Sequence, residues 1–182
     1  PEWSPAAPRL LAVGSILVRS RPGDTVWGSG CNPTKEGRWS AAGIHCLAVR
    51  GPLTRQFIID RGGTCPPIFG DPALLLPTVH QLTPQPLREL AILPHLDDDA
   101  GWNLGRRRGI FTINPGWPWE RVVAEIVRSA HIISSSLHGL IVAEAYGIPA
   151  TWAHFTTRPG KIEDYFAGTG RTPPEPLRWE QT

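Results

Sequence analysis

The sequence predicts an α/β protein made of two open, Rossmann-like parallel sheets. Short apolar runs rich in β-branched residues recur along the chain, and most of them end in a turn of glycine, serine or proline. Segments long enough to form helices follow several of these runs in both halves of the chain. Hydrophobic residues make up 41% of the sequence, which is enough to build a core in each half.

The first half contains three expected strands, one expected helix and one apolar turn segment. These elements are Arg9–Leu17, Asp24–Trp27 and His45–Val49 as strands, a helix from Pro52 to about Arg61, and the turn segment Phe69–Leu76. Pro52 suits the first turn of a helix, because that turn needs no N–H donor there. Gly28-Ser29-Gly30 follows the second strand, where glycines let the backbone turn tightly or let a ligand come close.

A proline-rich stretch, Pro77–Pro86, separates the two halves. Prolines clustered with polar residues interrupt both helices and strands, so this stretch is the best candidate for a domain boundary. We therefore expect an N-terminal Rossmann-like domain over residues 1–78, a linker over 79–88 and a C-terminal Rossmann-like domain over 89–182.

The second half is expected to alternate strands with helices. The expected strands are Leu90–His95, Gly109–Asn114, Ala130–Ile133 and Ile148–Ala153. The segment Glu120–His131 predicts an amphipathic helix whose apolar face is formed by Val122, Val123, Ile126, Val127 and Ala130. Residues 97–108 combine three aspartates with three arginines and predict a solvated loop. They lack the interleaved glycine and distal acid of a calcium loop, so a metal site is disfavoured.

The stretch Ser134–Pro149 is the feature around which the second half is organised. A buried strand ends here, three serines offer a helix N-cap and a cluster of hydroxyls, and an apolar helix follows until Gly147. A helix N-terminus at the carboxyl end of a parallel strand favours anions, because its first N–H groups lack acceptors within the helix. His138 lies in the first turn, where a charged ring is disfavoured unless an anion is nearby. We therefore expect His138 to face an anionic ligand.

Net charge, cysteine content and the lack of a long apolar stretch disfavour a nucleic-acid-binding, disulfide-linked or membrane-spanning protein. The net charge of +2 lacks the basic surplus of a nucleic-acid-binding protein, so no nucleic acid partner is expected. Cys31, Cys46 and Cys65 are odd in number and lack CxxC spacing, which favours core or loop cysteines in a reducing, cytoplasmic location. No apolar stretch approaches the length of a membrane span. The start at Pro1 without a methionine predicts an excised or processed piece.

Six short stretches, taken in order, carry a family resemblance. They are Val26–Gly30, Val49–Thr54, Gly70–Leu74, Pro94-His95, Ser134–Pro149 and Lys161–Tyr165. Together they resemble the polysaccharide pyruvyl transferase family. The resemblance implies a two-domain, GT-B-like fold and the transfer of an enolpyruvyl group from phosphoenolpyruvate, the donor substrate, to two hydroxyls of a sugar. The product would be a cyclic pyruvate ketal, and no separate cofactor is implied.

By this resemblance, His138 and Arg50 are expected to be catalytic and Lys161 to bind phosphoenolpyruvate. The other expected substrate-binding residues are Ser134, Ser135, Ser136, Gly139, Gly28, Ser29, Gly30 and His95. No metal is implied. Phosphoenolpyruvate carries a carboxylate and a phosphate, which suit a planar guanidinium, a titratable ring and an ammonium group. A histidine can be a general acid or, when protonated, a phosphate ligand.

The implied acceptor is a lipid-linked or nucleotide-linked saccharide precursor of a bacterial exopolysaccharide or cell-wall polymer. Peripheral membrane association through that acceptor, at the inner face of the membrane, and a homo-oligomer are both compatible with the resemblance. The three residues considered for stacking on a sugar ring are Trp102, Trp117 and Trp119.

Two departures from the family pattern leave alternatives open. Ser136 stands where many members have arginine, so either Arg158 or Arg171 compensates or the chain belongs to a branch without that arginine. The family's opening strand and glycine-rich turn are not recognisable before Val26, so the N-terminal sheet is expected to be truncated. That expectation leaves three explanations, namely a fragment, a partner chain that covers the exposed edge, or a degenerate enzyme.

Two other functions remain as alternatives. One is a GT-B-like glycosyltransferase that uses a nucleotide sugar, and the other is a non-catalytic module that binds a sugar or nucleotide. A serine hydrolase is disfavoured because the Gly-x-Ser-x-Gly elbow is missing, and zinc chemistry is disfavoured by the scattered cysteines and histidines.

Overall fold

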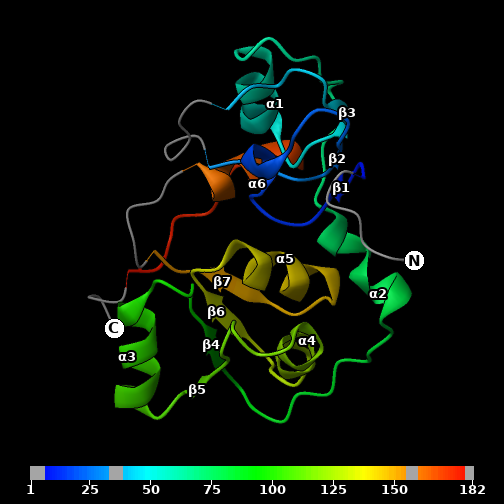
Figure 1. Cartoon of the computed structure of the whole chain (residues 1–182). Coiled ribbons are helices and arrows are strands. Elements are labelled where there is room, and N and C mark those ends of the chain that lie inside the picture. Colours follow the sequence, from blue (N-terminus) through cyan, green and yellow to red (C-terminus); the bar gives the residue numbers. More distant parts are fainter. Residues whose placement is uncertain (1–6, 33–38, 155–159, 179–182) are drawn as a thin grey trace. The chain divides into compact units, whose positions relative to one another are not determined.

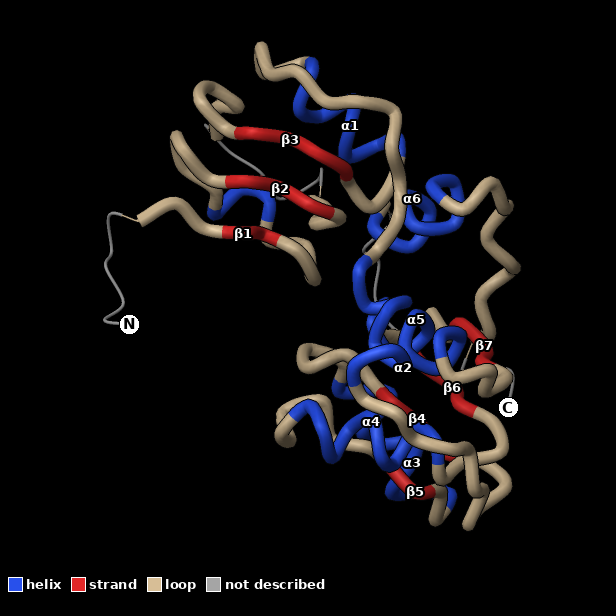
Figure 2. Tube along the Cα trace, turned by 90° about the vertical axis from the view of Figure 1, so that its right-hand side faces the viewer, coloured by secondary structure: helices blue, strands red, loops and turns tan. Residues whose placement is uncertain are grey.

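The computed structural model describes residues 7–32, 39–154 and 160–178, which form two compact units (Figures 1 and 2). Unit 1 runs to Pro72 and also contains the segment that ends at Pro173, whereas unit 2 begins at Ala73 and also contains the segment from Pro174. The division therefore falls before the expected linker. The helix at 161–168, expected in the C-terminal domain, belongs to unit 1 because it packs on the first helix of that unit.

Unit 1 contains a parallel sheet with the strand order β1-β2-β3. Its elements are β1 (Leu10–Leu11), the 3-10 helix η1 (Leu17–Arg19), β2 (Thr25–Trp27), β3 (His45–Ala48), α1 (Pro52–Ile59) and α6 (Lys161–Gly168). Val26 and Cys46 are paired in register and point to the same face, where they pack with Phe57 of α1 in the core. Leu10 and Leu47 lie on the opposite face and are 61% and 55% exposed.

The expected first strand, Arg9–Leu17, is wrong beyond Leu11. Gly14 has a φ of 115°, and the chain turns there toward η1 instead of continuing beside β2. The Gly14 carbonyl accepts hydrogen bonds from the N–H of Gly30 at 3.0 Å and from the hydroxyl of Ser29 at 2.9 Å. Apolar residues after the strand, including the fully buried Leu17, therefore enter the core from a turn.

Unit 2 contains a parallel sheet with the strand order β5-β4-β6-β7. Its elements are α2 (Leu76–Val79), β4 (Ala91–Leu93), α3 (Asp99–Arg108), β5 (Phe111–Thr112), α4 (Trp119–Val127), β6 (Ile132–Ser134), α5 (Leu137–Ala145) and β7 (Ala150–Trp152). A 3-10 helix, η3 (Pro72–Leu75), leads into it. Two all-parallel sheets with intervening helices confirm the predicted α/β class with Rossmann-like open sheets.

Two helices close the core of unit 2. The apolar face predicted for α4 is buried at Val123, Ile126 and Val127. Helix α5 packs against α4, β6 and β7, and it is apolar around most of its circumference (Figure 1). A helix without a polar face is stable only when it is buried, which explains why the strand before α5 and the strand after it lie directly beneath it.

The expected solvated loop at 97–108 is wrong, because most of this stretch forms α3. Asp98 is the N-cap, and its carboxylate accepts an N–H of the first turn at 3.3 Å. Asp99 lies in the first turn and Arg106–Arg108 lie in the last turn, an order that complements the helix dipole. Gly109 ends the helix in the left-handed region with a φ of 64°. The charges that suggested a loop are thus signals of a helix with capped ends.

Candidate functional site

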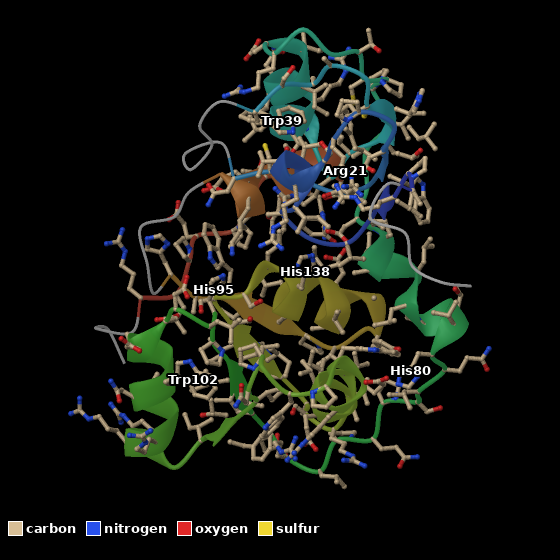
Figure 3. The ribbon with its side chains drawn as sticks, viewed as in Figure 1. Arg21, Trp39, His80, His95, Trp102 and His138 are labelled. Carbon is tan, nitrogen blue, oxygen red and sulfur yellow. The ribbon has the colours of Figure 1, made fainter. Side chains whose placement is uncertain are left out.

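The strand order of unit 2 reverses between β4 and β6. The chain passes from β4 outward to β5 and then returns past β4 to β6, from which it continues to β7. Open parallel sheets bind ligands outside the carboxyl ends of their strands at such a reversal. Pro94 and His95 follow β4 at this edge, and Ser135 to Gly139 follow β6, with His95 and His138 labelled in Figure 3. The anion site expected from the sequence therefore coincides with the topological switch point.

Ser134 and Gly139 shape the floor of this site. The buried hydroxyl of Ser134 donates to the carbonyl of Leu93 at 2.7 Å and accepts the N–H of Ser136 at 3.0 Å. A Cβ on Gly139 would lie 2.3 Å from Ser134 Oγ and 2.7 Å from Leu93 Cδ2. Only glycine lets the first turn of α5 come this close to the ends of β4 and β6, so these two residues fix the helix N-terminus at the switch point.

Ser135 connects the two strand ends to α3. Its hydroxyl accepts the N–H of His95 at 2.8 Å and donates to Asp98 Oδ2 at 2.6 Å. Burial raises the pKa of Asp98, and the hydrogen bond from Ser135 opposes that rise. The ring of His95 accepts the N–H of Asp97 at Nδ1, 3.2 Å away. Sequence reasoning missed Asp98 because it assigned the residue to a loop, although an aspartate before a helix with a basic last turn is an N-cap signal.

His138 and Ser136 provide the polar groups at the start of α5. Ser136 is the N-cap with an extended backbone, and its side chain makes no capping hydrogen bond. His138 is half-buried in the first turn, where helix N–H groups have no acceptor inside the helix. A hydroxyl, an imidazole and a helix N-terminus form an arrangement suited to an anion. In the part of the chain that the structure describes, no group of three His, Cys, Asp or Glu side chains could hold a metal ion.

Arg50 lies in the interior of unit 1 with all three guanidinium nitrogens engaged. Nε and Nη2 are 3.1 and 3.0 Å from Asp164 Oδ2. Nη1 donates to Ser15 Oγ at 2.8 Å, and Nη2 donates to the carbonyl of Cys31 at 2.8 Å. The side chain is fully buried. These contacts give Arg50 a structural role in unit 1, and its expected contact with phosphoenolpyruvate stays a prediction.

The carboxylate of Asp164 occupies the N-terminus of α1. Its Oδ1 accepts the N–H of Leu53 at 2.9 Å and that of Thr54 at 3.0 Å, and its Oδ2 accepts the Thr54 hydroxyl at 2.6 Å. A Cβ on Gly51 would lie 1.8 Å from the Asp164 carbonyl oxygen, so this glycine lets α6 approach the start of α1. An internal carboxylate therefore takes the place that an anionic ligand could take at this helix.

The glycine turn after β2 is packed against protein groups. Gly28 has a φ of 85°, and a Cβ there would lie 2.2 Å from Pro72 Cδ. A Cβ on Gly30 would lie 2.2 Å from Arg50 Cζ, and Ser29 between them is buried. These glycines are required for the packing of Arg50 and Pro72, and the expected binding role of the turn stays a prediction.

The remaining basic candidates belong to unit 1 or lie outside the described residues. Lys161 is the half-buried first residue of α6. The guanidinium of Arg171 lies over the ring of Phe166, 4.9 Å from its centroid. Arg158 lies outside the described residues. Of the residues expected to bind substrate, those of unit 2 lie together at one sheet edge, and the others that the structure describes belong to unit 1.

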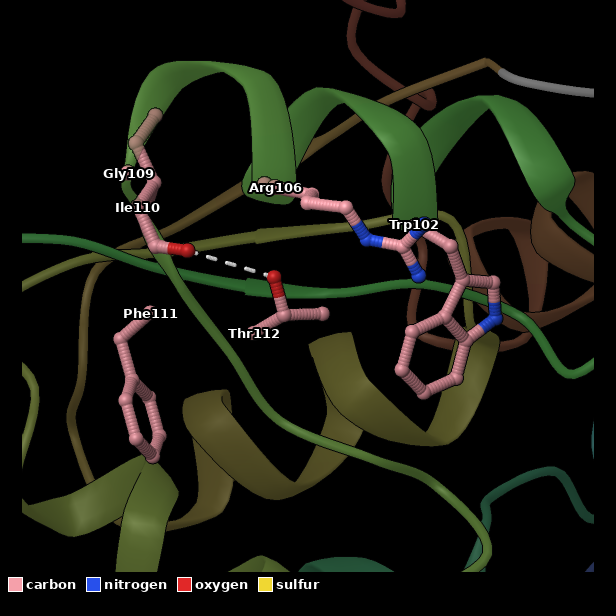
Figure 4. Close-up of a pocket in the computed structure, with 7 residues that line it drawn as sticks. Trp102, Arg106, Gly109, Ile110, Phe111 and Thr112 are labelled. Carbon is pink, nitrogen blue, oxygen red and sulfur yellow. Dashed lines mark hydrogen bonds between the residues drawn. The ribbon is translucent and has the colours of Figure 1, made fainter.

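One of the three tryptophans considered for sugar stacking lines a hollow. Trp102 and Arg106 of α3 border an open hollow of about 360 Å³ beside β5 (Figure 4). Trp117 instead lies beneath the guanidinium of an α4 arginine, 3.7 Å from it, and packs against the core of unit 2. Trp119 is 53% exposed at the start of α4.

The chain is similar to known proteins over most of its length. A family model described as polysaccharide pyruvyl transferase matches residues 35–152, which is more than half of the chain. The uncharacterized protein L143 of Acanthamoeba polyphaga mimivirus is 29% identical over 168 residues, which cover 81% of this chain and 54% of that protein. The chain thus spans about half the length of this relative. The range matched by the family model includes Arg50 and the whole switch-point site, and it ends before Lys161.

Proposed function

Because the chain belongs to the polysaccharide pyruvyl transferase family, we propose that it transfers the enolpyruvyl group of phosphoenolpyruvate to two hydroxyls of one sugar, forming a cyclic pyruvate ketal. The proposed acceptor is a lipid-linked or nucleotide-linked saccharide precursor of an exopolysaccharide or cell-wall polymer. The observation that carries the proposal is the position of His138 in the first turn of α5, at the switch point of a sheet inside the matched range.

The N-terminus of α5 is proposed to hold one anionic group of phosphoenolpyruvate. Backbone N–H groups of a first helical turn point outward along the axis, and they stabilise a carboxylate or phosphate together with the helix dipole. Ser136 adds a hydroxyl whose oxygen is not used for capping. The hydrogen bonds of Ser134 and Ser135 to the ends of β4 and β6 hold this turn in place before substrate arrives.

His138 is proposed to deliver the proton that the reaction requires. C3 of phosphoenolpyruvate gains the proton, C2 acquires oxocarbenium character, and one acceptor hydroxyl adds to C2 while its own proton replaces the one that the imidazole gave. The bond from C2 to the phosphate oxygen then breaks, the second hydroxyl attacks C2, and the proton of that hydroxyl leaves with the phosphate. An imidazole that carries a proton at this helix N-terminus can donate it to C3. Its other expected role, a charged ligand of the phosphate, is compatible with the same position.

Lys161 is proposed to bind phosphoenolpyruvate. Lys161 begins α6, and Asp164 one turn later fixes that helix to α1 through Leu53 and Thr54. Arg50 neutralises the Asp164 carboxylate. In this proposal Arg50 acts as a positioning residue for α6, and direct contact with substrate would be an additional role.

Binding of phosphoenolpyruvate is the first test, measured as a ligand-dependent shift of the melting temperature. The wild-type chain and His131→Gln should both be stabilised, whereas His138→Ala should lose most of the shift. His131 is a matched control, because it is half-buried in the same unit but precedes β6 at the opposite end of the strand, where its Nε2 lies 2.8 Å from Thr151 Oγ1. Stabilisation by a uridine nucleotide, with none by phosphoenolpyruvate, would contradict the proposal and support a glycosyltransferase.

Turnover is the second test. Phosphate release from phosphoenolpyruvate should depend on an acceptor when the chain is offered a panel of nitrophenyl or lipid-linked sugars, and mass spectrometry should identify a ketal on the product. His138→Ala should lower kcat by about 100-fold or more, the usual loss when a general acid is removed. Binding of sugar without any phosphate release would instead support the non-catalytic module.

A further inference from the structure

Cys46 and Cys65 bring their sulfur atoms together although they are 19 residues apart in the sequence. Cys46 lies on β3, Cys65 lies on the segment after α1, and the thiol of Cys46 donates to Cys65 Sγ at 2.8 Å. Both are free thiols. A disulfide has an S–S distance of about 2.05 Å, so closure requires a movement of less than about 1 Å. We propose that this pair is a redox modification site that forms a reversible intramolecular disulfide on reaction with a hydroperoxide.

The backbone that follows the pair already runs in parallel, as a cross-link between the two segments needs. Val49, three residues after Cys46, forms a parallel bridge with Phe69, four residues after Cys65. Its N–H donates to the carbonyl of Ile68 at 3.1 Å, and its carbonyl accepts the N–H of Gly70 at 3.0 Å. The two segments therefore run side by side in the same direction. A disulfide between Cys46 and Cys65 would join these two segments a few residues before the bridge between Val49 and Phe69, and it would leave that bridge unchanged.

The surroundings of the pair shift the pKa values of the two thiols in opposite directions. The hydrogen bond from Cys46 lowers the pKa of Cys65, and the positive charge of Arg55 lowers it further, against the effect of burial. The Arg55 Nε donates to the carbonyl of Cys65 at 3.0 Å, which holds the guanidinium next to this residue. The pKa of Cys46 is raised by the same hydrogen bond and by burial. Cys65 is thus the nucleophile, and Cys46 keeps the proton and acts as the resolving thiol.

Access to the pair favours a small oxidant. Cys65 is 7% exposed, and its neighbours Thr64 and Pro67 are exposed on the surface segment. Cys46 is partly buried against the core of unit 1. Hydrogen peroxide is small enough to reach a sulfur in this setting, whereas a bulky disulfide such as oxidised glutathione has to bring a large leaving group to it.

The reaction is balanced with one peroxide. The Cys65 thiolate attacks one oxygen of hydrogen peroxide, the O–O bond breaks, and the departing hydroxide takes up a proton to give water and a sulfenic acid on Cys65. Cys46 Sγ then attacks Cys65 Sγ, and the S–O bond breaks. The departing oxygen leaves as a second water with the proton of Cys46. Each sulfur loses one electron, and the peroxide gains the two electrons. A dithiol reductant reverses the change by thiol–disulfide exchange.

The test uses the full chain in its native state, treated with a small excess of hydrogen peroxide and then alkylated under denaturing conditions. The wild-type chain should lose two alkylatable thiols and about 2 Da of mass, and it should give a linked peptide containing Cys46 and Cys65. Dithiothreitol should restore both thiols. Cys31→Ser should also lose two thiols, which shows that the third cysteine is not required.

Cys46→Ser and Cys65→Ser should form no intramolecular disulfide under the same treatment. Three results would overturn the proposal for the wild-type chain, and each is read directly from the peptide map. They are retention of both thiols, further oxidation of Cys65 to the sulfinic acid without a cross-link, and a disulfide that includes Cys31. None of these results depends on phosphoenolpyruvate chemistry, so the site is tested independently of the proposed function.

Discussion

Arg50 and Asp164, 114 residues apart in the sequence, form a fully buried ion pair in unit 1. The guanidinium comes from the end of β3 and the carboxylate from α6, and the same carboxylate caps α1 at Leu53 and Thr54. One ion pair therefore connects a strand end, the helix that follows it and a helix from much later in the chain. The part of unit 1 that carries Lys161 depends on this connection.

Replacing Asp164 with Asn should destabilise the protein by about 3–5 kcal/mol, because it leaves the Arg50 guanidinium charged and buried without its counterion. Urea unfolding followed by circular dichroism measures the free energy of unfolding. Glu163→Gln is the matched control on the same helix. Glu163 accepts the N–H of Gly160 at 2.5 Å, and an amide oxygen can still accept it, so the cost should stay below about 1 kcal/mol. An equal loss of unfolding free energy in both variants would show that the buried ion pair does not contribute more to stability than the hydrogen bond of Glu163.

Ser135→Ala and Ser136→Ala should differ in how much they destabilise the protein, although the two residues are adjacent. Ser135 satisfies both the N–H of His95 and the buried carboxyl of Asp98, so its loss should cost about 1–3 kcal/mol. Ser136 makes no capping hydrogen bond, so its replacement should cost less than about 0.5 kcal/mol. If Ser136 instead contacts phosphoenolpyruvate, Ser136→Ala should weaken binding with little effect on stability. Denaturant unfolding and the thermal-shift titration separate these two effects.

Asp98→Asn should change how stability depends on pH. Burial raises the pKa of Asp98, so the folded state binds this proton more tightly than the unfolded state, whose carboxyl has an ordinary pKa near about 4. Wild-type stability should therefore fall as the pH rises from about 4 through the folded pKa, and it should then level off. Asn keeps an acceptor for the α3 cap and does not titrate. The variant should gain stability relative to wild type over that interval, and a constant difference from pH 4 to 8 would contradict this prediction.

Asp24→Asn should change the pH dependence of stability in the opposite direction. Asp24 is buried and accepts the Arg9 Nε at 3.1 Å and the N–H of Arg21 at 3.0 Å, and the hydrogen bond from the Arg9 side chain lowers its pKa to about 2. The stability from this depressed pKa is present above the unfolded value of about 4 and is lost as the pH falls toward 2. In an acid-unfolding experiment, the variant should not show this loss of stability between about pH 4 and pH 2. Asp60→Asn, at an exposed helix end, is the matched control, and an equal change in both variants would contradict this prediction.

Much of the fold and part of the candidate site can be predicted from short-range patterns. The alternation of apolar strands and helices predicts both parallel sheets, and the 3.6-residue period predicts the buried face of α4. The serines, His138 and the glycines around α5 predict a helix N-terminus at a strand end. The order of motifs predicts the family, which the comparison confirms. Helix α3 was missed because its capping signals were read as solvated charge, so the error concerned the interpretation of a signal that was present.

Local sequence patterns are enough to predict what most segments form, because strand alternation, helix periodicity, caps and turn residues act over a few neighbouring positions. Which distant segments share a core depends on tertiary packing. In the folded chain, Asp164 contacts Arg50 and Thr54, and Cys65 contacts Cys46. The hydroxyl of Ser135 is hydrogen-bonded to both His95 and Asp98. These pairings result from burying apolar surface and providing partners for buried charges and N–H groups at the same time. No local pattern encodes them, because each partner alone is compatible with many neighbours.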